Sequence, residues 1–256
     1  MKYFESTAVE SQEEIAPGIY SLLLITENIA SEAAPGQFVS VYSNQGSRML
    51  PRPISICGAD GRTGLLRLVY RVAGSGTEEF SHCKKGDRLD VLGPLGNGYP
   101  LDKGYKRPLL VGGGIGSPPL CFLSEKLHGE KTVVSGYRDS HTFLTGELSR
   151  DAALYVATDD GSVGTKGTVL DAIREHELEA DAIFACGPAQ MLCALKAYAA
   201  EKGIDCFISL EERMACGIGA CLACVCRSED VDPHTNVCNK RVCKDGPVFD
   251  AREIEI

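Results

Sequence analysis

The segment Cys216-Gly217-Ile218-Gly219-Ala220-Cys221-Leu222-Ala223-Cys224 decides how the C-terminal part of this chain folds, because its thiols have the spacing of a metal centre. The three cysteines follow the pattern C-x4-C-x2-C, and further cysteines stand downstream. With a fourth thiolate, this is the plant-type ligand pattern of a [2Fe-2S] cluster. Such a cluster exchanges one electron at a time, so the segment predicts a protein that moves electrons.

Small residues between the cysteines support this interpretation. A [2Fe-2S] cluster takes two thiolates on each iron, and Gly217, Gly219 and Ala220 let backbone amides approach its sulfur atoms and adjust its potential. The fourth ligand is open among three downstream residues, Cys226, Cys238 and Cys243. We favour Cys243, because a turn over residues 242–247 can present its thiolate.

A zinc site is the alternative metal centre. Four cysteines have the spacing of tetrahedral zinc ligands: Cys221, Cys224, Cys238 and Cys243. That arrangement leaves Cys216 and the glycines without a role. A disulfide framework is less favoured still, because nothing in the sequence indicates an oxidising compartment. The six cysteines outside this region stand in apolar surroundings and are expected to be core residues.

Composition narrows the class of protein further. The 256 residues allow one or two domains with a small appendage, and the formal net charge of -9 argues against nucleic acid or an anionic membrane as the main partner. The longest uncharged stretch, Pro108 to Ser124, holds four glycines and three prolines and so cannot form a spanning helix. The first 14 residues carry four glutamates and one lysine, which predicts no secretory signal. Together with reduced thiols, these features predict a cytoplasmic protein that does not bind membranes.

The hydrophobic pattern divides the chain into three parts. Residues 1–102 contain short apolar or alternating runs between turn signals, which predicts an antiparallel barrel or sandwich. Residues 103–207 alternate strands with helices, which predicts a parallel α/β sheet. Its strands are expected at residues 108–111, 132–137, 154–158 and 182–186, and its helices up to Leu127 and at 169–176 and 189–202. A strand at 206–210 then leads into residues 208–256, the small cluster subdomain.

Two motifs in the first part have the character of a phosphate or flavin site. Arg52-Pro53-Ile54-Ser55 closes one strand, and Val69-Tyr70-Arg71 ends the next, followed by Gly76-Thr77. An arginine and a serine at a strand end bind a phosphate or a flavin ring edge, and a glycine-rich helix start can face a pyrophosphate. Each motif alone is better explained by a surface ion pair or an ordinary turn, and the two become informative only together, in this order, upstream of a nucleotide-like domain.

Two glycine-rich turns in the second part predict a dinucleotide site. One contains Gly112, Gly113, Gly114 and Gly116, and the other is Cys186-Gly187-Pro188. Both follow strands of the expected parallel sheet, where backbone amides can approach a dinucleotide at the carboxyl edge. The first turn departs from the G-x-G-x-x-G fingerprint, since Ser117 stands at the last glycine position. The alternative explanation for the second turn is a simple strand-to-helix connection with Cys186 packed as a small apolar side chain.

The order of these motifs resembles that of the ferredoxin-reductase-like flavoproteins. Within that group, residues 211–221 and 242–249 look like those of the electron transfer subunits of NAD-dependent (type B) dihydroorotate dehydrogenase. The resemblance covers nearly the whole chain and is most specific in the cluster segment. It implies a multi-domain protein in which a β-barrel holds FAD, an α/β domain binds NAD, and a C-terminal subdomain holds [2Fe-2S].

The resemblance also implies roles for particular residues and a partner. FAD would contact Arg52, Pro53, Ile54, Ser55, Val69, Tyr70, Arg71, Gly76 and Thr77. The cluster would be held by Cys216, Cys221, Cys224 and Cys243. The family's partner is an FMN-containing catalytic subunit in a heterotetramer with two copies of each chain, and NAD accepts the electrons. Arg138 suits a 2'-phosphate, but the resemblance favours NAD over NADP.

No group of residues predicts catalysis on an organic substrate within this chain. The five histidines, His82, His128, His141, His176 and His234, share no motif. We therefore expect oxidation of the organic substrate on another chain, docked near the cluster loop. Two other interpretations remain open: a related module of a hydrogenase, a sulfide dehydrogenase or a ferredoxin:NADP oxidoreductase, and a zinc-binding regulatory protein.

Overall fold

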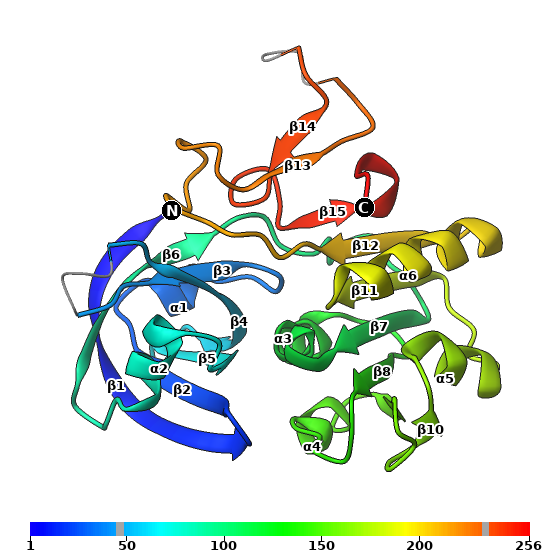
Figure 1. Cartoon of the computed structure of the whole chain (residues 1–256), viewed down its shortest axis with the longest axis horizontal. Helices are drawn as coiled ribbons and strands as arrows, with labels where there is room; N and C mark the ends of the chain where they lie inside the picture. The colour runs from blue at the N-terminus through cyan, green and yellow to red at the C-terminus, as the bar shows by residue number, and fades with distance from the viewer. Residues whose placement is uncertain (45–48, 232–235) are drawn as a thin grey trace.

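The computed structural model of the chain describes residues 1–44, 49–231 and 236–256. Figure 1 shows a β-barrel on one side, a sheet with flanking helices on the other, and a C-terminal extension above the seam between them. All predicted cofactor and cluster residues lie in the described ranges, whereas His234 lies outside them. The multi-domain β plus α/β fold predicted from the sequence is confirmed.

Six antiparallel strands form a closed barrel in the order β1-β2-β5-β4-β3-β6. The ring closes because β6 pairs with β1, which leaves no exposed sheet edge. Apolar residues that alternate along β2 and β5 fill the interior, as Leu22, Leu24 and Leu68 illustrate. The bounds are β1 (Tyr3–Ala16), β2 (Ile19–Ile25), β3 (Phe38–Val41), β4 (Arg52–Asp60), β5 (Leu65–Arg71) and β6 (Arg88–Leu95), with short helices α1 (Ile29–Glu32) and α2 (Ser75–Ser81) between them.

The second part is a seven-stranded sheet in the order β10-β9-β8-β7-β11-β12-β15. Every pairing within it is parallel except that of β12 with β15. The bounds are β7 (Pro108–Gly113), β8 (Thr132–Tyr137), β9 (Ala153–Thr158), β10 (Thr165–Lys166), β11 (Ala182–Cys186), β12 (Asp205–Ser209) and β15 (Val248–Asp250). Parallel strands need helical crossovers, and these cover both faces of the sheet.

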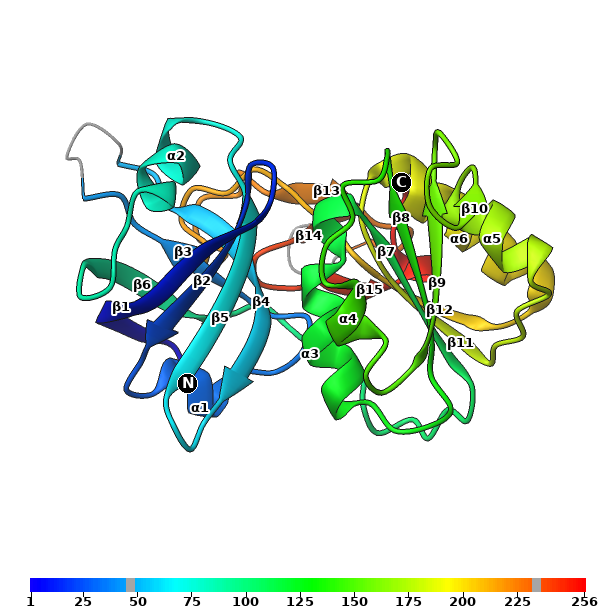
Figure 2. The same ribbon diagram turned by 90° about the horizontal axis from the view of Figure 1, so that it is seen from below.

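The crossover helices separate into two layers, as Figure 2 shows. Helices α3 (Pro118–Lys126) and α4 (Thr145–Leu148) lie between the sheet and the barrel, whereas α5 (Val169–Glu175) and α6 (Ala189–Lys202) cover the opposite face. On α3, Leu120 and Leu123 pack against the sheet, and Phe122 is buried in the barrel's own core. The barrel and the sheet therefore share a packed interface rather than a linker.

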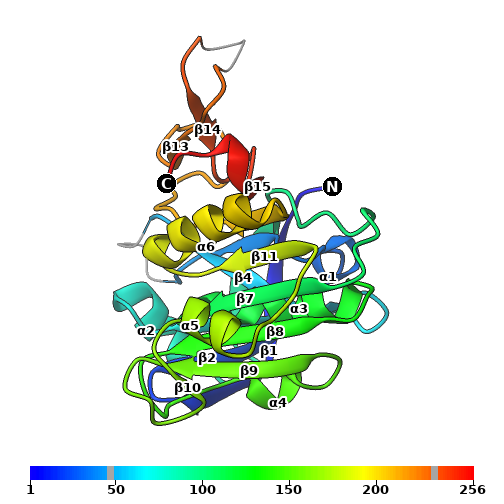
Figure 3. The same cartoon turned by 90° about the vertical axis from the view of Figure 1, so that its right-hand side faces the viewer.

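The C-terminal part leaves the sheet at β12 and returns to it at β15. Between them lie the cysteine segment and a small ladder of β13 (Val225–Arg227) and β14 (Asn239–Arg241), which projects away from α6 in Figure 3. A short 3-10 helix, Ala251–Glu253, follows β15. A separate apolar cluster ties this part to the barrel, since Phe38 and Leu95 pack with Val242 and Phe249.

Most elements lie where the sequence predicts them, and several strands that the sequence analysis did not name are additions, among them β1, β6 and β15. The predicted strand at 206–210 is β12, and the helix predicted at 189–202 is α6. The sequence pattern did not reveal β1, whose glutamates hide its alternation, or β15, which is only three residues long. In the described ranges, no helix is long and apolar enough to cross a membrane.

Candidate functional site

A cavity of 1710 Å³ opens where the barrel, the parallel sheet and the C-terminal part meet. Typical pockets for one small molecule hold about 300–1,000 Å³, so this one has room for more than one ligand group. It brings together most of the predicted cofactor residues: Arg52, Pro53, Ile54, Ser55, Val69, Tyr70, Arg71, Thr77, Gly113, Gly114, Gly116, Cys186, Gly187 and Pro188. Gly76 and Gly112 are not among the lining residues.

On the barrel side, the start of β4, the end of β5 and the start of α2 form the wall. The expectation that Arg52 to Ser55 close a strand is wrong, because Arg52 is the first residue of β4. Arg52 donates a hydrogen bond to the carbonyl of Leu50, and its guanidinium lies against Gly76, which explains why a glycine stands there. The Thr77 hydroxyl accepts hydrogen bonds from the backbone N–H groups of Ala73 and Gly74. The arginine thus presents a fixed positive charge beside an ordered helix start, a suitable arrangement for phosphate groups.

Tyr70 contributes to the wall in a different way from Arg52. Its ring stacks near Tyr20 at 6.0 Å between centroids, and its hydroxyl hydrogen-bonds Gln12 inside the barrel at 3.1 Å. Burial of the phenol raises its pKa well above the ordinary value. Its side chain is therefore part of the barrel core.

On the sheet side, the two glycine-rich turns pack against each other. They follow β7 and β11, which are adjacent parallel strands with Gly112 opposite Cys186. A Cβ on Gly116 would lie 2.2 Å from the Cys186 carbonyl oxygen, and one on Gly113 would lie 2.7 Å from Pro188. Backbone therefore touches backbone at this carboxyl edge, and the glycines leave the outer surface open for a dinucleotide.

Gly112 has a supporting position rather than one on the cavity wall. It lies within β7, where a Cβ would come within 2.7 Å of the Ser117 hydroxyl and 3.0 Å of Leu120. This glycine allows α3 to approach the strand closely. That role matches the helix-to-strand packing function of a fingerprint glycine.

A segment that the sequence analysis did not single out as cofactor-binding also lines the cavity. Residues 209–214 leave the carboxyl end of β12 and pass over the cavity before reaching Cys216. The pKa of Cys186 is raised to about 12, first by burial and then by the nearby Glu211 carboxylate. The sequence could have predicted this segment as cofactor-binding, because it follows a strand of the parallel sheet. The glycine-rich turns were identified from the same kind of position.

The cysteine loop holds Cys216 in an environment suited to a thiolate. Burial opposes its ionisation, but backbone N–H groups of Ile218, Cys221 and Ala220 and the Cys221 thiol outweigh that cost and lower its pKa to about 6. The amides of Ala220 and Cys221 lie 3.2 and 3.4 Å from the sulfur. This donor set fits a cluster ligand, because the same N–H groups stabilise negative charge on sulfur.

The remaining predicted ligands form a second thiol pair. The Cys243 backbone N–H donates to Cys224 Sγ at 3.4 Å, and both residues are buried in one apolar cluster. Burial and then the Cys224 thiol raise the pKa of Cys243 to about 12, and the charge of Cys216 also acts on it. Within the described ranges, no three His, Cys, Asp or Glu side chains converge on a single ion. The four thiols form two pairs of neighbours: Cys216 with Cys221, and Cys224 with Cys243. Two pairs match the two thiolates that each iron of a [2Fe-2S] cluster requires.

The two other downstream cysteines have different surroundings. Cys226 lies on β13 and donates its thiol to the Lys240 carbonyl at 3.4 Å, and Cys238 is exposed. The position of Cys243 beside Cys224 supports it as the fourth ligand, which stays a prediction. The loop between the first cysteines turns sharply at Leu222, a non-glycine residue with φ of 60°, whose side chain is exposed.

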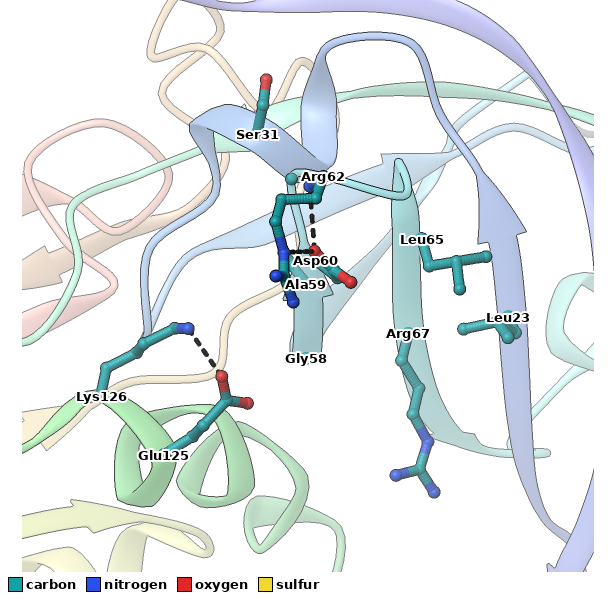
Figure 4. Close-up of a pocket in the computed structure, with 11 residues that line it drawn as sticks. Leu23, Ser31, Gly58, Ala59, Asp60, Arg62, Leu65, Arg67, Glu125 and Lys126 are labelled. Carbon is teal, nitrogen blue, oxygen red and sulfur yellow. Dashed lines mark hydrogen bonds and ion pairs between the residues drawn. The ribbon is translucent and has the colours of Figure 1, made fainter.

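A second, shallower hollow of 780 Å³ lies elsewhere, between the β4–β5 hairpin and the end of α3. Figure 4 shows that its charged side chains pair with one another, Arg62 with Asp60 and Lys126 with Glu125. Arg67, at its edge, forms an ion pair with Glu147 of α4. None of the predicted cofactor residues lines this hollow.

Comparison with known proteins agrees with this geometry. Residues 211–255 match the family model for the iron-sulfur cluster binding domain of dihydroorotate dehydrogenase B. A dihydroorotate dehydrogenase B (NAD(+)) electron transfer subunit from Geobacillus sp. is 44% identical over 257 residues, covering 98% of each chain. The subunit of the same name from Listeria monocytogenes serotype 4a is 43% identical over 254 residues, covering 97% of each.

A solved structure gives the same result for the fold. The structure of an NADH-dependent reduced ferredoxin-NADP oxidoreductase, described in connection with flavin-based electron bifurcation, superimposes with a TM-score of 0.88 at 30% identity. The match covers 98% of this chain and 90% of that one, so the cysteine loop is included. The identity, coverage and matching cluster domain together place the protein: the chain belongs to the family of dihydroorotate dehydrogenase B (NAD(+)) electron transfer subunits.

Proposed function

We propose that this chain takes electrons from dihydroorotate oxidation on an FMN-containing partner and delivers them to NAD+ through a [2Fe-2S] cluster and FAD. FAD, when bound, supplies the conversion between the single electrons of the cluster and the electron pair of a hydride. Family membership supports the overall role, and the two thiol pairs beside a large cofactor cavity support the order of the centres. The zinc-binding alternative lacks such support, since residues 211–255 match an iron-sulfur domain.

The observation that carries this proposal is the position of Phe38. Its side chain is 3% exposed and packs in one apolar cluster with Cys224 and Cys243, while the same residue lines the 1710 Å³ cavity. Phe38 thus belongs both to the wall of the cavity and to the apolar cluster that contains the second thiol pair. This shared apolar packing places the cavity next to the second thiol pair, which favours electron transfer within the chain.

The chain's own residues would divide the binding work between the two nucleotides. We assign FAD to the barrel wall, where Arg52 and Thr77 order the phosphate end and Ser55 faces the cavity. We assign NAD to the turns after β7 and β11, where Gly113 and Gly187 expose backbone. The two walls face one cavity, so the reacting ends of both nucleotides can meet there.

The cluster loop is the surface we propose for the partner. Ile218 and Leu222 of this loop are 44% and 60% exposed, and Cys221 is exposed between them. Apolar residues around an electron-transfer centre provide the contact that a catalytic subunit needs. We propose a heterotetramer with two FMN-containing subunits and two copies of this chain, located in the cytoplasm.

We retain the division into residues 1–102, 103–207 and 208–256 as a proposal for the domains. The barrel ends with β6, before the first boundary. At the second boundary the division is functional, because β12 spans it and β15 returns to the same sheet. The cluster part is thus built onto the edge of the nucleotide-binding sheet.

The direct test is dihydroorotate-dependent NAD+ reduction by this chain mixed with its FMN-containing partner, with each chain alone as control. Activity only in the mixture is the expected result. A stable, fully loaded complex without activity would contradict the proposed substrate.

A second candidate function follows from the match to the reduced ferredoxin-NADP oxidoreductase. In this alternative, the same cofactors exchange electrons with a ferredoxin rather than with dihydroorotate. NADH-dependent ferredoxin reduction by the loaded chain, combined with no response to dihydroorotate in the complex, would favour it.

A further inference from the structure

A buried hydroxyl of the barrel faces the cysteine loop. Ser40 on β3 is 1% exposed, and among the described residues its Oγ has no hydrogen-bond partner. A Cβ placed on Gly217 would lie 2.8 Å from this oxygen, so the hydroxyl lies directly against the loop. Buried polar atoms in folded proteins nearly always have partners, so an orphaned hydroxyl at this place calls for an explanation.

Strand alternation explains why Ser40 points out of the barrel. Val39 and Val41 are buried in the barrel core, whereas Phe38 packs outside it with Cys224 and Cys243. Successive side chains of a strand point to opposite faces, so Ser40 shares the outer face with Phe38. Ser40 is therefore a polar residue on the outer surface of the barrel, where the cysteine loop packs against it.

The neighbours of Ser40 connect it with both redox sites. Its direct partner across β3 and β4 is Pro53, which belongs to the cavity wall. On its other side is Gly217, whose φ of 67° lies in the left-handed region and whose missing side chain leaves the space that Ser40 Oγ and Leu95 border. Gly217 immediately follows Cys216, the thiol of the first pair.

We propose that the Ser40 hydroxyl donates a hydrogen bond to a sulfur atom of the cluster held by the loop, and so raises the reduction potential of that cluster. The reduced cluster carries one more negative charge than the oxidised one, so a donor stabilises the reduced state more. Ser40 is thus a positioning and tuning residue contributed by the flavin domain. The inference rests on the proposed electron route, in which this loop holds the cluster.

The test is a redox titration of the purified, cofactor-loaded chain, with the cluster followed by electron paramagnetic resonance and FAD by its absorption. Ser40→Ala should lower the cluster potential and leave the FAD potential unchanged. We expect about a tenfold change in the ratio of reduced to oxidised cluster at a fixed ambient potential, which is about 59 mV for one electron. Ser40→Thr, which keeps the hydroxyl, should restore most of the shift.

The matched control is Ser124→Ala. Ser124 lies on α3, is 4% exposed, and also has a hydroxyl without a partner among the described residues. It lies on α3 of the nucleotide-binding part and not in residues 208–256, so its substitution should leave the cluster potential unchanged.

A second measurement tests the contact itself. In deuterated water, electron-nuclear double resonance of the reduced cluster should reveal an exchangeable deuteron whose coupling is missing in Ser40→Ala. A fully loaded Ser40→Ala chain with an unchanged potential and unchanged deuteron couplings would overturn the proposal. Loss of the cluster from both Ser40→Ala and Ser40→Thr would make the serine a packing residue and would overturn it too. A parent chain that binds no iron would instead refute the proposed electron route.

Discussion

The guanidinium of Arg52 occupies the space that a side chain on Gly76 would need, since a Cβ there would lie 2.4 Å from Arg52 Nε. The two residues are far apart in sequence and come from β4 and α2. Their contact joins the two sequence motifs that were assigned to FAD. Because the side chain that would be displaced is flexible, this contact can be tested without unfolding the barrel.

Gly76→Ala is expected to weaken FAD binding about tenfold, or about 1.4 kcal/mol. The new methyl group would push the Arg52 guanidinium away from the cavity wall, and α2 itself tolerates alanine well. The measurement is the dissociation constant of FAD from fluorescence titration of the flavin-free chain. Gly146→Ala on α4 is the control, because a Cβ there meets no atom within 4 Å. Unchanged FAD affinity in Gly76→Ala would show that Arg52 does not contact the flavin nucleotide.

Cys243→Ala is expected to abolish the cluster, whereas Cys238→Ala and Cys226→Ala keep it. Cys243 lies beside Cys224 in a buried apolar cluster, but Cys238 is exposed and Cys226 binds the Lys240 carbonyl. Iron and acid-labile sulfide content, together with visible absorption, measure the outcome. Retained FAD in each variant confirms that the barrel is folded. A full cluster in Cys243→Ala and none in Cys238→Ala would reverse the assignment.

Glu147→Gln is expected to reduce the free energy of unfolding by about 1–2 kcal/mol, because it leaves the Arg67 charge without its partner between the barrel and α4. The side chains of this pair are only 27% and 33% exposed, and Arg67 also donates to the Ser21 hydroxyl at 2.9 Å. Urea denaturation followed by circular dichroism gives the change.

The control for this ion pair is Glu179→Gln, which breaks the more exposed pair with Arg107. Its side chains are 52% and 76% exposed, so the expected change is within about 0.5 kcal/mol. Equal effects in the two variants would mean that the Arg67 pair does not hold the barrel and the sheet together.

The stability of the chain is expected to fall as the pH rises from 9 to 11, in part because of Cys83. Burial, followed by the carboxylates of Asp87 and Glu79, raises the pKa of its thiol from 9.0 to about 11. Over this range the unfolded thiol ionises at a lower pH than the folded one, so proton release favours unfolding. Between these pH values, the free energy of unfolding of Cys83→Ala should fall by about 1 kcal/mol less than that of the parent. Urea midpoints at pH 8.5 and 11 measure this, and parallel losses in both proteins would exclude Cys83 as a cause.

Much of the fold could be predicted because its elements carry strong local patterns. The apolar strands of the parallel sheet and the long helix α6 have patterns that a short window of sequence reveals. Strand β1 escaped prediction because four glutamates break its alternation, and only pairing with β2 and β6 makes it a strand. Strand β15 escaped because three residues carry no pattern, and it is fixed by its pairing with β12.

The candidate site also has residues that local sequence patterns predict and residues that only the tertiary structure brings to it. The glycine-rich turns and the cysteine spacing are local signals, and the structure brings the turns together at one sheet edge. The contribution of residues 211–214 depends on the path of the chain across the cavity after β12. No local pattern contains that path, since it is decided by how the sheet packs against the barrel.

By itself, the sequence determined the kind of chemistry: the spacing of Cys216, Cys221 and Cys224 and the order of the glycine-rich motifs indicate a cluster beside nucleotide sites. Only the tertiary structure placed Cys243 rather than Cys238 next to Cys224, and turned Phe38 and Ser40 outward onto the cluster part. The physical reason is that ligand spacing and periodicity are properties of short segments. Contacts between distant segments arise only when closure of the barrel and the return of β15 fix their relative positions.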